Sequence, residues 1–501
     1  MTVLPDWLHQ RASLTPDRLA LAAGDARWSF RELDERVTQT AHRLSALGVN
    51  AGDRVALLLR NGSPFVTLVH AISRAGAVIV PLNIRLTPAE IVWQLQDVRA
   101  RLLLHDDANA QIALIASHDM PNMRSIHSND IASNLQLPTS DLQLPTSDLQ
   151  SLTPNPFPLA SPHSILYTSG TTGQPKGAVL TFGNHWWSAI GSALNLGLQA
   201  ADRWLACLPL FHVGGLAILL RSVIYGCIAI VHESFDPAAV NRAIDDEGVT
   251  IVSVVSAMLQ RMLAERGEKP YPSTLRCVLL GGGPAPRDLL EECARRGVPV
   301  VQTYGLTEAA SQVATLAPKD ALRKLGSAGK PLFPTEVRIE RDGVRASAGD
   351  VGEIVVRGPT VTPGYLDQPE ATAKALRDGG LHTGDLGYLD DDSYLYVLDR
   401  RDDLIISGGE NVYPAEIESV LRLHPAVEDA GVVGVPDERW GQAAAAFIVL
   451  RSGASPTEDD LHRFCIERLA RYKIPARFTV VESLPRNAAG KLLRRKLLSP
   501  D

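Results

Sequence analysis

The chain has 501 residues, of which 45% are hydrophobic and 21% are charged, and its formal net charge is −7. This length is too great for a single hydrophobic core, so roughly two to four domains or subdomains are expected. The composition is that of a globular protein and excludes extensive disorder, and the acidic balance disfavours a nucleic-acid partner, which requires a basic face.

The N-terminus, the longest apolar region and the cysteines indicate where in the cell the protein is expected. Asp6 and His9 interrupt the apolar run that a signal peptide needs, and Arg221 interrupts the longest apolar region, 213–231, which disfavours a membrane span. The five cysteines lack paired metal-ligand spacing, so buried thiols are expected. A soluble, cytoplasmic protein is therefore expected, and whether it forms a homo-oligomer is left open.

The first third of the chain alternates helix and strand patterns. Ser29 and Glu32 form a capping box before a helix that Gly48 ends. Short apolar strands are expected at 55–59 and 77–80. Further helix starts are marked by prolines in a first turn: Pro64 and Pro88. Helices between short buried strands predict an α/β fold with a largely parallel sheet covered on both faces.

Residues 118–162 have a different composition, rich in Ser, Pro, Asn and Asp. Within them the seven residues 135–141 are repeated directly as 142–148. A repeat this short cannot build a solenoid, so the stretch is interpreted as a surface linker that tolerated a duplication. A strand at 165–167 then leads into a glycine-rich loop, 168–177.

This loop combines three glycines, four hydroxyl side chains and one lysine. Glycines let successive N–H groups approach an anion closely, and Lys176 adds a positive charge, so the loop predicts a phosphate site. A flexible surface turn is the alternative. The loop departs from the P-loop pattern because Pro175 precedes the lysine and no hydroxyl follows it, which disfavours a kinase or GTPase.

The middle third resumes the alternation, with strands expected at 251–255, 277–280 and 300–302. Two glycine-containing turns, 281–285 and 303–308, follow the second and third of these strands. Ligands of open α/β sheets bind beyond the carboxyl ends of the strands, so both turns are candidate ligand sites.

The last part of the chain contains two smaller units. From about residue 325, short strands with turns predict an antiparallel β-subdomain. A charged break at 399–403 marks a boundary between an N-terminal domain, 1–401, and a small α+β domain, 402–501, which is placed to move about the break. The strands and helices expected in these units are 336–341, 352–356, 414–423, 430–435, 445–450 and 458–471.

Five strings in one order along most of the chain resemble the signature motifs of the adenylate-forming superfamily: 168–177, 304–308, 383–385, 407–411 and 485–491. Further strings resemble the 2-succinylbenzoate–CoA ligases of menaquinone synthesis: 182–185, 193–197, 279–286, 326–331 and 404–411. The resemblance implies a two-step reaction. A carboxylate attacks the α-phosphate of ATP, releasing pyrophosphate and leaving an acyl-adenylate, and the CoA thiol then displaces AMP.

The resemblance also implies roles for individual residues. Lys491 would bridge the carboxylate and the α-phosphate, Thr307 would lie beside that phosphate, and Glu308 would bind Mg²⁺. Tyr304 would stack on adenine, and Asp385 would accept hydrogen bonds from the ribose. The expected ATP-binding residues are Thr168, Ser169, Gly170, Thr171, Thr172, Gly173, Lys176, Gly283, Pro284, Ala285, Tyr304, Asp385 and Arg400.

The acyl pocket is expected near His212, which matches the family position that gates it; a satisfied core histidine is the alternative. 2-Succinylbenzoate carries a second carboxylate, and burying it unpaired is costly. Arg221 is the expected partner, and an arginine that reaches solvent at a helix end is the alternative. The resemblance further implies Ser256, Gly281 and Gln312 as residues that line the pocket.

For the CoA step, the resemblance implies rotation of the C-terminal domain about Asp402. This movement would present the loop of Ser407, Gly408 and Gly409 to the pantetheine arm. Trp440 would stack on the CoA adenine or pack within the domain.

The expected function is therefore AMP-forming ligation of 2-succinylbenzoate to CoA, with ATP, Mg²⁺ and CoA as the small molecules involved. The alternatives are another aryl- or fatty-acyl-CoA ligase, a carrier-protein adenylation domain and a non-catalytic nucleotide-binding protein. The second lacks a carrier segment after Asp501, and the third would have no use for Lys491.

Overall fold

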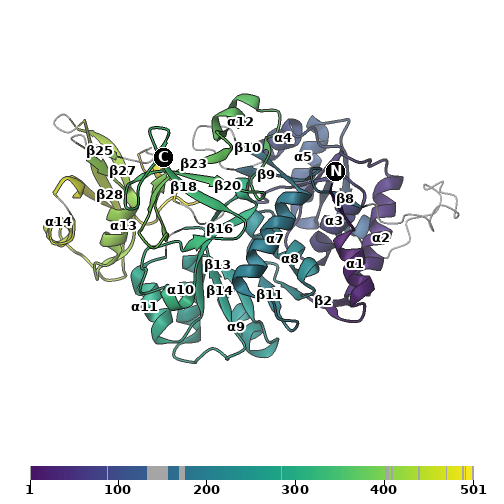
Figure 1. The fold of residues 1–501 in the computed structure, drawn as a ribbon, viewed down its shortest axis with the longest axis horizontal. Helices are drawn as coiled ribbons and strands as arrows, with labels where there is room; N and C mark the ends of the chain where they lie inside the picture. The colour runs from purple at the N-terminus through teal and green to yellow at the C-terminus, as the bar shows by residue number, and fades with distance from the viewer. Residues whose placement is uncertain are drawn as a thin grey trace.

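The computed structural model describes residues 2–86, 88–132, 156–168, 175–283, 285–400, 405–407, 410–437, 441–469, 471–487, 490 and 492–498. Figure 1 shows a large body built from two helix-covered sheets and a third, smaller sheet, with the C-terminal unit (yellow) at one end. The α/β fold, the β-subdomain and the small C-terminal α+β unit expected from the sequence are confirmed.

The first sheet holds the glycine-rich loop between two of its strands. Its seven strands follow the order β21-β10-β9-β5-β4-β6-β7. The strands are β4 (Arg54–Leu58), β5 (Val78–Pro81), β6 (Leu102–His105), β7 (Arg124–His127), β9 (Pro162–Thr168), β10 (Lys176–Thr181) and β21 (Gly364–Tyr365). The strands from β9 to β7 in this order run parallel, whereas β10 pairs antiparallel with both β9 and β21.

Strand β4 shows how this sheet is buried on both faces. Val55 and Leu57 pack with α2 (Phe30–Ala46) and α3 (Ser63–Arg74), whereas Ala56 and Leu58 pack with α4 (Pro88–Asp97) and α5 (Ala110–Asp119). Alternate side chains of a strand point to opposite faces, so a continuous apolar run is what a sheet covered on both sides requires.

Local signals in this region are largely confirmed, with one correction. Ser29 and Glu32 form the predicted capping box at the start of α2. The linker expected over 118–162 starts too early, because β7 and α6 (Ser128–Ala132) lie inside that range. Strand β7 was not predicted because its residues are polar. It lies at the edge of the sheet and has a neighbouring strand on one side only, so it can carry polar residues. The tandem repeat itself lies outside the described residues.

The second sheet has nine strands in the order β17-β16-β15-β14-β13-β11-β12-β2-β3. They are β2 (Leu19–Ala23), β3 (Ala26–Ser29), β11 (Arg203–Ala206), β12 (Ile228–Val231), β13 (Ile251–Val254), β14 (Cys277–Leu280), β15 (Val300–Leu306), β16 (Ser311–Leu316) and β17 (Lys330–Pro331). Helices α7 (Phe182–Leu196) and α8 (Val213–Tyr225) share a core with the first sheet, and the other face is covered by α9 (Pro237–Asp246), α10 (Ser256–Arg266) and α11 (Arg287–Arg295).

The β-subdomain is antiparallel throughout, as predicted. Its main strands are β18 (Glu336–Arg341), β20 (Gly352–Arg357), β23 (Gly380–Leu389) and β24 (Leu395–Arg400). Through β24 it contacts helix α13 of the C-terminal unit.

The C-terminal unit contains β25 (Ile405–Ser407), β26 (Glu410–Val412), α13 (Pro414–Arg422), β27 (Val427–Asp437), β28 (Gly441–Leu450), α14 (Glu458–Ile466) and β29 (Arg477–Val480). Helix α14 ends at Ile466, so its predicted extension to residue 471 is wrong. The chain turns there, which places Leu469 in the core of the unit.

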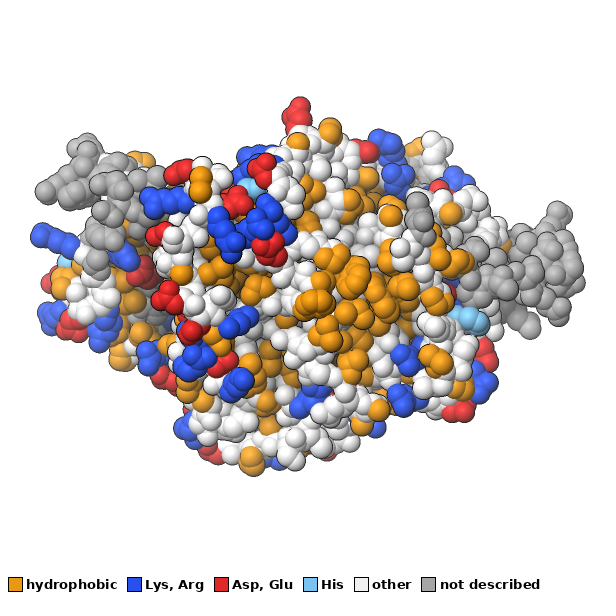
Figure 2. All heavy atoms as spheres, in the orientation of Figure 1, with side chains coloured by type: hydrophobic (Ala, Val, Ile, Leu, Met, Phe, Trp, Pro, Cys, Tyr) orange, Lys and Arg blue, Asp and Glu red, His pale blue; other side chains and the backbone are white. Residues whose placement is uncertain are grey.

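Burial accounts for the cysteines and for most of the apolar side chains. All five cysteines are free and buried, as expected. Figure 2 shows a group of hydrophobic side chains on the face over α7, where Leu194, Leu198 and Phe333 are exposed. In the part of the chain that the structure describes, no helix is both long and apolar enough to cross a bilayer.

Three histidines lie between the two sheets: His70 in α3, His163 in β9 and His185 in α7. His163 Nε2 is 3.1 Å from Ser73 Oγ, and His185 Nε2 is 2.9 Å from Ser164 Oγ. Burial lowers the pKa of His70 to about 4 and of His185 to about 3, and it lowers the pKa of His163 as well. All three imidazoles are therefore neutral at pH 7.

We expect these histidines to make the fold acid-sensitive. Their pKa values are lower in the folded chain, so unfolding takes up protons below pH ~6.5, the ordinary histidine value. The lowered pKa of His70 contributes about 3 kcal/mol to the free energy of unfolding above pH ~6.5. This stabilisation is lost as the pH falls to about 4, the pKa of His70 in the folded chain. Urea unfolding at several pH values should show a shallower dependence for His70→Gln than for the wild type; equal slopes would contradict the assignment.

Candidate active site

Four neighbouring strands of the second sheet bring predicted site residues to one edge. Strands β11, β13, β14 and β15 lie side by side and run parallel. The segments after their carboxyl ends carry, in the same order, His212, Ser256, Gly281 and the pair Thr307 and Glu308. Ligands of such sheets bind at this edge, and these residues come from widely separated parts of the sequence.

Glu308 lies in a short 3₁₀ turn, Thr307–Ala309, directly after β15. Its Oε1 accepts a hydrogen bond from the Tyr365 hydroxyl at 3.0 Å, and its main-chain oxygen accepts one from the Thr362 N–H at 2.7 Å. The ammonium of Lys176 lies 5.3 Å from the centre of the Tyr365 ring. The structure therefore brings a carboxylate, a phenol and an ammonium together beside the glycine-rich loop.

This arrangement fits a metal ion that arrives with a phosphate ligand. Within the described ranges, no group of three His, Cys, Asp or Glu side chains is placed to hold a metal. Mg²⁺ bound to a nucleotide needs only one or two protein carboxylates, because phosphate oxygens and water complete its octahedron. Glu308 meets that requirement.

Tyr304 and Asp385 form a second pair at this edge. The Tyr304 hydroxyl donates to Asp385 Oδ2 at 2.6 Å, and the Asp385 N–H donates to Thr383 Oγ1 at 3.1 Å. Asp385 is buried in β23 and lies opposite Arg400 of β24 in the strand register. The hydrogen bond fixes the tyrosine ring and the carboxylate relative to each other.

The turn predicted at 303–308 is shorter than expected, because β15 continues to Leu306. Strand β16 folds back and pairs with it, with an irregularity at Tyr304 and Gly305. A Cβ on Gly305 would lie 1.9 Å from the main-chain oxygen of Ser311, so only glycine permits this approach. The sequence did not predict that β15 extends to Leu306, because this extension depends on pairing with β16, whose residues follow the turn.

Arg221 is buried in α8, with 2% of its surface exposed, so the alternative that it reaches solvent is wrong. Its Nη2 donates to Ser188 Oγ at 3.0 Å, and its guanidinium carbon lies 5.8 Å from the centre of the Trp204 ring. Within the described residues its Nε has no hydrogen-bond partner and no carboxylate forms an ion pair with it. Burial lowers the pKa of this guanidinium, which reflects the cost of holding the charge here.

Two further residues of the expected acyl pocket share this property. His212 precedes the first residue of α8, and its Nε2 is buried without a hydrogen-bond partner among the described residues. Burial, with a smaller effect of Arg85, lowers the pKa of His212 to about 4, so the ring is neutral at pH 7. The Gln312 side chain in β16 is likewise buried, with neither amide atom bonded in that part of the chain. Buried polar atoms are normally satisfied, so these groups indicate a place for polar atoms of a ligand or for water.

Other expected residues are less informative. Thr168 Oγ1 donates to the Lys176 main-chain oxygen at 3.4 Å at the base of the glycine-rich loop, and a Cβ on Gly281 would contact Thr303. Gly283 and Ala285 follow β14, and Ser407 is buried at the end of β25. The following lie outside the described part of the chain, as does the Arg400 side chain: Ser169, Gly170, Thr171, Thr172, Gly173, Pro284, Asp402, Gly408, Gly409, Trp440 and Lys491.

Sequence reasoning missed Tyr365, Thr362 and Ser188. Tyr365 reaches Glu308 because β21 pairs with β10, where Ala178 lies opposite Tyr365. A glycine-tyrosine pair between turn residues was the only local signal, and it does not identify the partner strand.

Two protein families together match most of this chain. The AMP-binding enzyme family matches residues 8–366, and the AMP-binding enzyme C-terminal domain matches residues 416–491. A 2-succinylbenzoate–CoA ligase of Geobacillus kaustophilus (strain HTA426) is 55% identical over 497 residues, covering 99% of this chain and 98% of that protein.

Two solved structures of o-succinylbenzoate CoA synthetase (MenE) from Bacillus subtilis are also similar, each with 44% identity and a TM-score of 0.91. One is a complex with the acyl-adenylate intermediate OSB-AMP and covers 100% of this chain and 99% of its own. The other is a complex with ATP and magnesium ion and covers 99% of this chain and 100% of its own.

Proposed function

The chain belongs to the AMP-binding enzyme family, and we propose from this membership and from the site that it ligates 2-succinylbenzoate to coenzyme A. The reaction consumes ATP, requires Mg²⁺ and yields 2-succinylbenzoyl-CoA, AMP and pyrophosphate in the synthesis of menaquinone. The free, buried thiols support a cytoplasmic location as part of this proposal.

One observation carries the choice of acid: the buried Arg221 guanidinium has no carboxylate partner in the described residues. A buried charge without a counter-charge is strongly unfavourable, and a ligand carboxylate would relieve that cost. 2-Succinylbenzoate has two carboxylates, so one can be activated while the other binds Arg221. Gln312 and His212 offer further hydrogen-bonding groups for the same molecule.

In the first step, the carboxylate oxygen attacks the α-phosphorus and the bond to the β-phosphate oxygen breaks. Glu308, held by the Tyr365 hydroxyl, provides a carboxylate for the metal, and Lys176 provides positive charge beside the loop that would hold the β- and γ-phosphates. Bound Mg²⁺ would neutralise charge on the phosphates. Thr307 precedes Glu308 and is proposed to contact the α-phosphate.

Binding of the nucleoside is assigned to the Tyr304 and Asp385 pair. The Tyr304 ring would stack on adenine, with Gly283, Pro284 and Ala285 along the edge of the base. The Asp385 carboxylate, held by the tyrosine hydroxyl, would accept hydrogen bonds from the ribose with help from Arg400.

The C-terminal domain, 402–501, is proposed to adopt a different orientation in each of the two steps. Lys491 would serve adenylation, and rotation about Asp402 would then bring Ser407, Gly408 and Gly409 to the pantetheine arm, with Trp440 near the CoA adenine. In the second step the thiol sulfur attacks the acyl carbon, AMP leaves and the thiol proton is lost. The family matches end at 366 and restart at 416, which is compatible with a hinge at residue 402.

The proposal is tested by pyrophosphate release from ATP with 2-succinylbenzoate, benzoate or octanoate, each with and without CoA. We expect kcat/KM for 2-succinylbenzoate to exceed the other values by about 100-fold or more, because only this acid satisfies the second carboxylate site. Equal or faster turnover of benzoate or octanoate would overturn the choice of acid and leave a CoA ligase of another substrate. Absence of pyrophosphate with every acid would contradict the assignment as a ligase.

A further inference from the structure

Two hydrogen bonds in series connect the acyl side of the site to the turn that carries Glu308. Arg221 Nη2 donates to Ser188 Oγ at 3.0 Å, and Ser188 Oγ donates to the main-chain oxygen of Ala310 at 2.5 Å. An arginine can only donate, so the Ser188 oxygen is the acceptor in the first bond and its single proton is committed to Ala310. The three residues belong to α8, α7 and the segment between β15 and β16.

The turn that receives this hydrogen bond has an unusual backbone. Ala310 has φ of 52° and Ser311 has φ of 101°, both in the left-handed region that residues with a Cβ rarely adopt. The turn closes on Gly305, where the Ser311 oxygen lies against the Cα. Such conformations persist when surrounding groups hold them, and the Ser188 hydroxyl is one such group.

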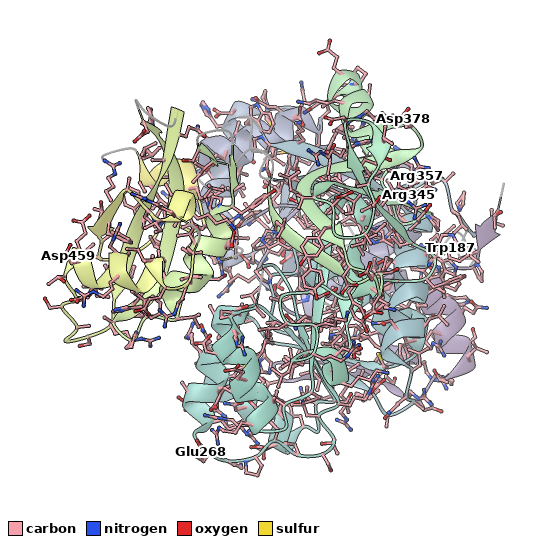
Figure 3. The ribbon with its side chains drawn as sticks, turned by 60° about the vertical axis from the view of Figure 1, so that its left-hand side comes forward. Trp187, Glu268, Arg345, Arg357, Asp378 and Asp459 are labelled. Atoms are coloured by element: carbon pink, nitrogen blue, oxygen red, sulfur yellow. The ribbon has the colours of Figure 1, made fainter. Side chains whose placement is uncertain are left out.

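Ser188 is well placed to hold the turn because it lies on the buried face of α7. It is 5% exposed, whereas its chain neighbour Trp187, which is labelled in Figure 3, is only partly buried. Helix α7 contacts β16 directly, so the serine joins packed elements rather than a surface loop.

We propose that Ser188 is a positioning residue that links Arg221 to the turn bearing Thr307 and Glu308. Its hydroxyl holds the Ala310 carbonyl, and through it the turn, in the geometry that adenylation needs. The inference rests on the proposed function, because Thr307 and Glu308 matter to the reaction only if they act on ATP. It implies that binding of an acid at Arg221 is communicated to the metal side of the site.

The test compares Ser188→Ala with Ser192→Ala. Ser192 is a matched control, because it is buried one turn further along α7 and makes no hydrogen bond to the turn. Ser188→Thr keeps the hydroxyl and tests rescue. Pyrophosphate release gives kcat and the KM for 2-succinylbenzoate, calorimetry gives the Kd of Mg·ATP without acid, and thermal unfolding monitors stability.

For Ser188→Ala we expect kcat to fall about tenfold and the Kd of Mg·ATP to rise about fivefold, while the KM for the acid changes less than about threefold. Ser192→Ala should retain the wild-type kcat and Kd, and Ser188→Thr should recover most of both. A Ser188→Ala variant that matches Ser192→Ala, or that raises only the KM for the acid, would overturn the proposal. If the wild type binds Mg·ATP but does not use 2-succinylbenzoate, the proposed acid fails while the Kd comparison still decides the role of Ser188.

Discussion

Arg221→Met is expected to raise the KM for 2-succinylbenzoate about 100-fold and to remove the preference for this acid over benzoate. Methionine keeps much of the side-chain volume and removes the charge, so the second carboxylate would be buried without a partner. Loss of one partner of a buried charge pair typically costs about 2–5 kcal/mol, which corresponds to roughly 30-fold to several thousandfold in affinity. Pyrophosphate release with the two acids gives the ratio of kcat/KM values that measures the effect.

The ratio of kcat/KM values for the two acids separates recognition of the second carboxylate by Arg221 from the link through Ser188. Any disturbance of the 305–311 turn would slow the reactions of both acids alike and leave the ratio unchanged. Arg266→Met is a suitable control. Arg266 is also buried, with 8% of the residue exposed, but it already pairs with Asp245 in α9, on the opposite face of the sheet. It should lower stability and leave the acid preference intact. Retention of the preference in Arg221→Met would mean that another group recognises the second carboxylate.

Much of the fold could be predicted from the sequence because its signals are local. Strand β4 reads as a continuous apolar run, since Val55 and Leu57 face one layer of helices while Ala56 and Leu58 face another. The Ser29 capping box marks the start of α2 within the first turn. Strand β7 was missed because Arg124–His127 is polar, and its place in the sheet depends on pairing with β6.

The same distinction applies to the site. Gly281 and Glu308 lie in turns that follow predicted strands, so the sequence could place both at one edge of the sheet. Tyr365 and Ser188 could not be placed in this way, since they reach the site through a strand pairing and a helix contact between segments far apart in the sequence. Arg221 was an intermediate case. An arginine within an apolar run suggested a buried charge, but only the structure excluded the route to solvent.

Tyr365→Phe provides the control for a test of Glu308. It removes the hydroxyl that donates to Glu308 Oε1 and keeps the ring beneath Lys176 and the carboxylate itself. We expect only about a tenfold loss of kcat, the usual cost of one hydrogen bond that orients a charged group. Its Mg²⁺ requirement should stay close to that of the wild type.

Glu308→Gln is expected to lower kcat by about 10³-fold and to raise the Mg²⁺ concentration needed for half-maximal activity. The amide retains the shape of the side chain and can still accept from Tyr365, so the loss isolates the negative charge. Without that charge the metal loses its protein ligand, and the phosphates lose the fixed neutralisation on which the transition state depends. Rates of pyrophosphate release titrated with Mg²⁺ measure both effects. If Glu308→Gln lowers kcat but leaves the Mg²⁺ requirement unchanged, the carboxylate acts on the turn or on the substrate rather than on the metal.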